Sequence, residues 1–232
     1  MKANHNYFLV IISTLFISGC VIYPQTFDIP LISEKNELKV DGGVSVIPSA
    51  SATITYGLTQ KMAVQASGNI GSDNHYLQGA IGLYKNYGTN NVMEVYAGLG
   101  SGYGDAYSNS MPGNLAGNYR IGFAQFNIGQ RKLDFANMDI GAGLKTGLIN
   151  SNLTDKNYFQ WYGEYGPFPD YHDVSFLAQP SIAARIGGKN LKFSMKASCL
   201  WLHSFSENES HIPYSRYNVG IGLNYGFKLK NK

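Results

Sequence analysis

Histidines with hydroxyl or acidic neighbours are the residues of this 232-residue chain best suited to catalysis. They are His172, His203 and His211, accompanied by Asp170, Asp173, Ser204, Ser206, Glu207 and Glu209. A histidine that activates a serine must lie within hydrogen-bond reach of its hydroxyl. Adjacent residues of a strand point to opposite faces, so His203 and Ser204 cannot form such a pair. We therefore expect these to be solvated loop residues and the protein not to be an enzyme, with a hydrolase as the alternative.

Other familiar chemistry is missing from the sequence. There is no CxxC or HExxH pattern and no glycine-rich phosphate loop, so we expect neither a metal site nor a cofactor. The net charge is only +3, and no basic run accompanies it. Nucleic acid is therefore not an expected partner.

One aromatic stretch has the composition of a recognition surface. Residues 157–173 read NYFQWYGEYGPFPDYHD, and the candidates for contact are Trp161, Tyr162, Tyr165 and Phe168. Rigid aromatic rings beside glycine, proline and acidic residues suit a glycan or protein ligand. The alternative is that the rings pack on one another or close the mouth of the fold.

The first 34 residues predict export and a lipid anchor. One lysine precedes an apolar run over 7–17, which is too short to span a membrane and has the length of a signal-peptide core. Ile17-Ser-Gly-Cys20 resembles a bacterial lipobox, which implies a signal peptide over 1–19 and a lipid on Cys20. An ordinary secretory signal is the alternative. Residues 20–34, with two prolines, are then the lipidated cysteine and a tether, and Cys199 has no disulfide partner.

The remaining chain, 35–229, predicts one all-β domain. Segments with period-two alternation lie at 36–45, 50–58, 61–70, 75–86, 91–103, 118–129, 133–146, 174–187, 191–203 and 215–228. This gives ten strands, with eight as the alternative count. No long amphipathic helix pattern occurs between them.

The connections divide into short turns and longer loops that alternate along the chain. Turns of a few residues follow every second strand, whereas 104–117, 147–173 and 204–214 are long. In an antiparallel up-and-down barrel, alternate connections share one rim, and this asymmetry is typical of outer-membrane barrels. With ten strands both chain ends lie at the short-turn rim, which faces the periplasm.

The last strand, RYNVGIGLNYGF at 216–227, shows two contrasting faces. Val219, Ile221 and Leu223 form an apolar row, and Asn218 alternates with glycines. A soluble barrel places the apolar face inside, and a membrane barrel places it outside. Only 14% of residues are charged, against about 25% on average, which favours a transmembrane β-barrel. We expect the lumen to hold Lys39, Asp41, Glu94, Asp139, Lys145, Arg185, Lys192, Lys196, Arg216 and Asn218.

Two positions depart from regular alternation. Phe123 and Phe126 have opposite parity, which predicts a bulge in the sixth segment. Pro180 lacks the N–H that a ladder requires, and a closed barrel has no free edge for it, so we expect a second bulge there.

Several pieces together resemble a known group. Cys20, IPLISEKNEL at 29–38, TYGLTQKMAVQASG at 55–68 and EVYAGLGSGYG at 94–104 are similar to the small outer-membrane β-barrel lipoproteins of the Bacteroidetes. The resemblance implies an outer-membrane barrel and supplies no activity.

We therefore expect a lipid-anchored outer-membrane barrel with a structural or surface-binding role through its long loops. Its partners would be membrane lipid and a glycan or protein ligand, with the anchored N-terminus on the periplasmic side. A narrow pore or transport accessory is one alternative, and a membrane-embedded lipid or peptide hydrolase is another.

Overall fold

The computed structural model describes residues 21–24, 28–107, 114–133, 137–156, 170–205 and 212–229. These residues form strands β1 (Glu37–Ser45), β2 (Ser49–Gly57), β3 (Met62–Gly71), β4 (Asn74–Tyr87), β5 (Asn91–Tyr107), β6 (Asn114–Leu133), β7 (Met138–Asp155), β8 (Asp170–Gly187), β9 (Leu191–Cys199), β10 (Trp201–Ser204) and β11 (Tyr217–Lys228). No helix in this part of the chain is long and apolar enough to cross a membrane.

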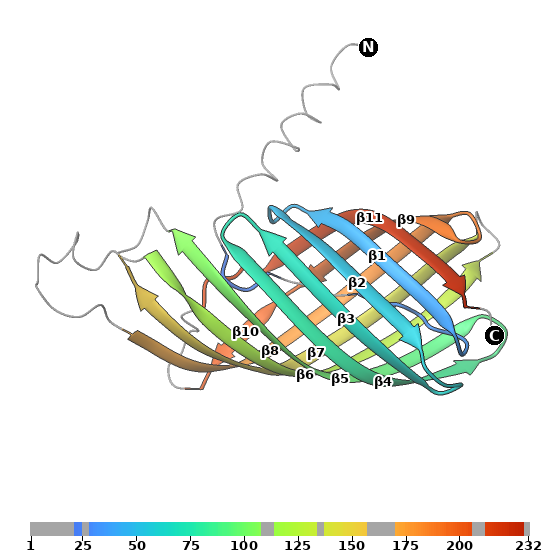
Figure 1. Ribbon diagram of the computed structural model, residues 1–232, viewed down its shortest axis with the longest axis horizontal. Helices are drawn as coiled ribbons and strands as arrows, with labels where there is room; N and C mark the ends of the chain where they lie inside the picture. Colours follow the sequence, from blue (N-terminus) through green and yellow to red (C-terminus); the bar gives the residue numbers. More distant parts are fainter. Residues whose placement is uncertain are drawn as a thin grey trace, which may run out of the picture.

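The strands close into one antiparallel up-and-down barrel (Figure 1). Each strand pairs with its neighbour in sequence, and β1 closes the barrel by pairing with β11. β9 and β10 pair with β8 in one continuous register and are separated only by Leu200, so they act as one strand and the barrel has ten. The predicted fold class and strand count are confirmed.

The exterior of the barrel is apolar and its interior polar. On β11 the side chains of Val219, Ile221 and Leu223 are 43%, 49% and 57% exposed, whereas Asn218 and Asn224 are buried. Large apolar side chains are exposed in the same way on the other strands, including Ile54, Ile70, Leu77, Leu99, Leu144 and Ile182. Since hydrocarbon tolerates such a surface and water does not, the fold is that of a transmembrane barrel.

Neither predicted bulge is present. β6 keeps an unbroken register with β5 across Phe123 and Phe126, and the shift with β7 falls instead between Gln130 and Leu133. Phe123 simply points inward, because part of the lumen is apolar. Pro180 pairs in register with Leu144 on β7.

On the other side of Pro180, the pairing with β9 ends at Ser181 and the pairing with β10 begins at Ala178. Leu200, between these two strands, donates its backbone N–H to the carbonyl oxygen of Arg216, which continues the register of β9 with β11. The ladder is thus interrupted beside the proline without any extra residue.

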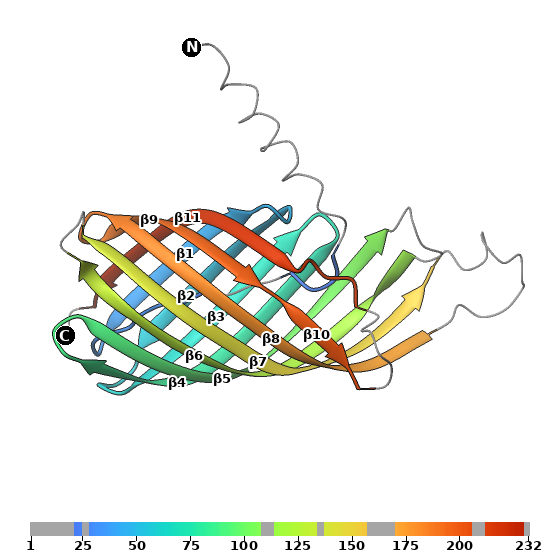
Figure 2. The same ribbon diagram turned by 180° about the vertical axis from the view of Figure 1, so that it is seen from behind.

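Strands β5 to β8 are longer than expected and extend beyond the rest of the barrel at one rim (Figures 1 and 2). Much of the predicted loops 104–117 and 147–173 is therefore strand. The outward side chains of this extension are polar, with Asn118, Asn152 and His172 exposed in one row across β6, β7 and β8. The extension thus stands in water beyond the apolar band.

The residues before β1 occupy the barrel interior. We call residues 21–24 and 28–33 the lumenal segment, because Val21, Ile22, Tyr23, Ile29 and Leu31 are all buried there. The sequence predicts a tether at the short-turn rim for this stretch, and the structure differs. An irregular chain with two prolines cannot join the sheet, but it can lie in the lumen where side chains of the wall satisfy its backbone.

Candidate functional site

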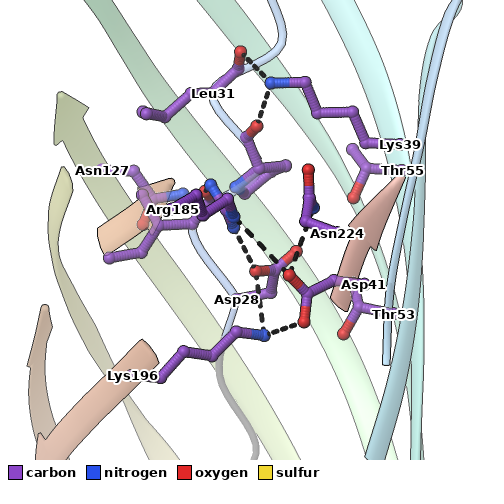
Figure 3. A network of polar contacts seen from close by, with 12 residues as sticks. Asp28, Leu31, Lys39, Asp41, Thr53, Thr55, Asn127, Arg185, Lys196 and Asn224 are labelled. Carbon is purple, nitrogen blue, oxygen red and sulfur yellow. Dashed lines mark hydrogen bonds and ion pairs between the residues drawn. The ribbon is translucent and has the colours of Figure 1, made fainter. Parts of the chain in front are cut away.

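A buried cluster of charges holds the lumenal segment at mid-barrel (Figure 3). Arg185 of β8, only 2% exposed, donates to the Asp28 carboxylate at 2.7 Å, and its Nε lies 3.5 Å from the Asp41 carboxylate of β1. Lys196 of β9 lies 3.2 Å from Asp28 and also pairs with Asp41. Asn224 of β11 donates to Asp41 at 3.1 Å. Each charge of this cluster is therefore paired with one of the opposite sign.

Side chains of the wall also hydrogen-bond the backbone of the segment. Lys39 Nζ donates to the carbonyl oxygens of Pro30 and Leu31 at 2.6 and 2.8 Å. Arg185 donates to the Ile29 carbonyl oxygen at 2.7 Å. In the opposite sense, the Glu94 carboxylate accepts the backbone N–H of Ile32 at 2.6 Å. These contacts replace the ladder bonds that an irregular buried chain lacks.

Apolar packing surrounds the first part of the segment. The Tyr23 ring packs edge-on against Tyr76 and Tyr119, with centroids 5.8 and 5.7 Å apart. Lys145 Nζ lies 4.3 Å from the centroid of the Phe123 ring and donates to the Gln78 amide oxygen at 2.6 Å. This half of the lumen is thus a packed aromatic core.

Glycines of the wall make room for the side chains of the segment. A Cβ added at Gly141 would lie 2.8 Å from Ile29 Cγ2, and one at Gly129 would lie 2.7 Å from Leu31 Cδ2. At Gly104 it would lie 2.7 Å from Ile22 Cα. These three glycines therefore leave spaces that the segment fills.

Most of the residues expected in the lumen lie there. Those buried are Lys39, Asp41, Glu94, Asp139, Lys145, Arg185, Lys192 and Asn218, and Lys196 is partly buried. Lys192 pairs with Asp139 at 2.7 Å, apart from the mid-barrel cluster. Arg216 differs from the expectation, because it precedes β11 and is exposed.

The hydroxyl and histidine candidates do not come together. His203 points outward and stacks on Trp201, with ring centroids 6.2 Å apart. Ser204 points inward and is buried, where it donates to the Asp173 carboxylate, which also accepts from Ser175 at 2.7 Å. His172 is exposed on the exterior. The described residues also contain no group of three metal-ligating side chains.

Several predicted residues lie outside the described residues. They are the lipid-attachment residue Cys20, the loop aromatics Trp161, Tyr162, Tyr165 and Phe168, and the loop residues Ser206, Glu207, Glu209 and His211. The ends of β7 and β8 that flank the aromatic loop are joined by the Thr154 hydroxyl, which donates to Asp170 at 2.7 Å. Lys156 also pairs with Asp105 of β5 at 2.7 Å, and that hydrogen bond raises the pKa of the lysine.

The segment itself provides partners that were not among the predicted lumenal residues. Asp28 joins the charged cluster, and its carbonyl oxygen accepts from Gln125 at 2.7 Å. Glu37 accepts the Ser33 N–H at 2.7 Å and pairs with Arg131 at 2.8 Å. The available signal was an acid in an otherwise apolar stretch, since Asp28 stands between Phe27 and Ile29.

Comparison with known proteins gives a likeness of architecture. No family model and no curated protein matches this chain. Among solved structures it is similar to the outer membrane protease OmpT from Escherichia coli, with 13% identity and a TM-score of 0.49 over 83% of this chain and 94% of that chain. It is also similar to the KdgM porin, with 8% identity and a TM-score of 0.34 over 82% and 99% of the two chains. A third is the translocator domain of the autotransporter NalP from Neisseria meningitidis, with 10% identity and a TM-score of 0.35 over 83% and 86%.

These identities and TM-scores carry no argument about activity. The fold and the site together define the class, which is a ten-stranded transmembrane β-barrel whose own chain fills the lumen.

Proposed function

We propose that this protein is a closed outer-membrane barrel with a structural or surface-binding role rather than a pore. The observation that carries the proposal is the filled lumen. The lumenal segment is held by buried ion pairs and by backbone hydrogen bonds from several strands. Water and solutes would have to displace this segment before they could cross.

The surface-binding part of the proposal rests on the extension of β5 to β8. β7 ends and β8 begins in this extension, and its outward row of Asn118, Asn152 and His172 is polar. A loop with aromatic residues at such a site suits a glycan or protein ligand. The candidate contacts are Trp161, Tyr162, Tyr165 and Phe168.

The anchoring part of the proposal is a lipid on Cys20. A Cys20→Ala change should abolish incorporation of radiolabelled palmitate and still allow the barrel to insert. Attachment of palmitate to that variant would show that Cys20 is not the lipidated residue.

Conductance tests the absence of a pore. The purified full-length protein, reconstituted in planar bilayers, should give a flat current trace under applied voltage. An open porin in the same bilayers serves as the positive control. Stable unitary currents from this protein would overturn the proposal and favour the narrow-pore alternative.

A further inference from the structure

The lumenal segment begins at the rim where β5 to β8 extend. The Val21 carbonyl oxygen accepts from the side chain of Asn74, the first residue of β4, at 2.9 Å. The Ile22 N–H donates to the carbonyl oxygen of Pro213, in the connection between β10 and β11, at 2.9 Å. Both partners belong to the rim of the long connections.

The segment ends at the opposite rim. Asn86, next to the last residue of β4, donates to the Ser33 carbonyl oxygen at 2.6 Å. The Asn36 N–H then donates to the carbonyl oxygen of Gly57, where β2 ends, at 2.8 Å. The described parts of the segment therefore reach from one rim of the barrel to the other before β1 begins.

Chain length agrees with this path. An extended chain covers about 3.3–3.6 Å per residue, so positions 21–33 reach at most about 43–47 Å. The hydrocarbon core of a bilayer is about 30 Å thick. The segment is thus long enough to cross the membrane inside the barrel.

We propose that the mature N-terminus leaves the barrel at the rim of the long connections, so that the lipid on Cys20 enters the outer leaflet at the cell surface. The inference rests on the proposed function for the location, the orientation and the lipid. It reverses the periplasmic anchor that the strand count alone predicts. The protein would be a surface lipoprotein threaded through its own barrel.

Covalent geometry and the barrel surface support this placement. Cys20 is bonded to Val21, whose carbonyl oxygen accepts from Asn74 at this rim, so a lipid on Cys20 would be attached one residue from a point fixed at the rim. The aromatic core around Tyr23 blocks a return of acyl chains through the lumen. The exterior just below this exit is apolar, with Ile70 and Leu77 71% and 67% exposed. Acyl chains that bend over the rim therefore meet a lipid-facing surface.

Site-specific proteolysis of intact cells tests the inference. A factor Xa recognition sequence with flexible flanks is inserted between Cys20 and Val21, and the cells are labelled with radioactive palmitate. Factor Xa added to intact cells should remove at least nine-tenths of the label from the barrel band. Loss of label only after the outer membrane is permeabilised would overturn the inference.

Two control insertions separate this inference from the proposed function. A site between Ser72 and Asp73 lies at the same rim as Val21, and a site between Gly88 and Thr89 lies at the other. The first should be cut in intact cells and the second only in permeabilised cells. If both controls behave in this way and the Cys20 site alone is protected, the proposed function stands and the threaded anchor is wrong. If the controls are reversed, the proposed orientation fails, and the outer-leaflet placement fails with it.

Discussion

At the scale of single residues, Arg185 links the barrel wall to the segment inside it. Its guanidinium contacts the carboxylates of Asp28 and Asp41 and the carbonyl oxygen of Ile29, all buried. A buried ion cluster is weak evidence for added stability, but the loss of one member leaves uncompensated charge. The carboxylates of Asp28 and Asp41, paired with Arg185 and Lys196, therefore fix the position of the segment in the lumen.

Removal of the Arg185 charge should be costly. Among the described residues, Arg185→Met leaves Lys196 as the one cation paired with the Asp28 and Asp41 carboxylates, and we expect the free energy of unfolding to fall by about 3 kcal/mol. Urea unfolding in detergent micelles measures the change. The matched control is Lys156→Met, which breaks the exposed pair with Asp105 and should cost less than about 1 kcal/mol. If the two changes lowered the free energy of unfolding equally, Arg185 would not belong to a buried ion cluster that holds the segment.

A larger side chain in place of glycine should destabilise the barrel only where the glycine faces the lumen. Gly141→Val would push against Ile29 of the lumenal segment and should destabilise the barrel by about 1–3 kcal/mol. Gly79 of β4 is exposed on the exterior and has open space around it, so Gly79→Val is the control and should be nearly neutral. Thermal unfolding followed by the gel shift of heated samples compares them. A neutral Gly141→Val would mean that Ile29 does not lie against β7.

Among the elements, the strands were predictable because the alternation of apolar and polar side chains is a local pattern of the sequence. The ranges of β1 to β4 agree within one residue with the alternating segments. The inward orientation of Phe123 was not predictable, because the aromatic cluster that buries it includes Tyr23 of the segment, which is distant in sequence. The ends of β6 and β7 were missed because Asn118 and Asn152 face outward into water while Tyr119 and Leu153 are buried inside, which inverts the alternation found in the apolar band.

A series of arginine substitutions along β7 should locate the edge of the membrane. Leu144→Arg faces the apolar band and should cost about 2–4 kcal/mol, whereas Asn152→Arg lies in the polar extension and should cost about 0–1 kcal/mol. Both side chains point outward. Folding into lipid vesicles, measured by urea titration, gives the values. A cost that stays constant along β7 would contradict a membrane boundary there.

At the scale of the whole molecule, the sequence predicts a barrel that is apolar outside but not what fills it. The lumenal charges Lys39, Asp41 and Arg185 were expected to face the interior. Arg185 and Lys196 do pair with Asp41 across the lumen, and the segment adds Asp28 and its backbone carbonyl groups, which no periodicity marks, to the same cluster. Contacts between an irregular chain and a curved wall depend on closure of the barrel, and no local pattern encodes them.

An engineered disulfide tests whether the chain's own segment occupies the lumen. In a Cys199→Ser background, Ile29→Cys is combined with Gly141→Cys on the inner face, or with Gly79→Cys on the outer face as the control. Mild oxidation of the folded protein in membranes should join the first pair, seen as a shift on a non-reducing gel that reductant reverses, and should leave the second unjoined. No cross-link with Gly141→Cys, or equal cross-linking of both pairs, would contradict the filled barrel.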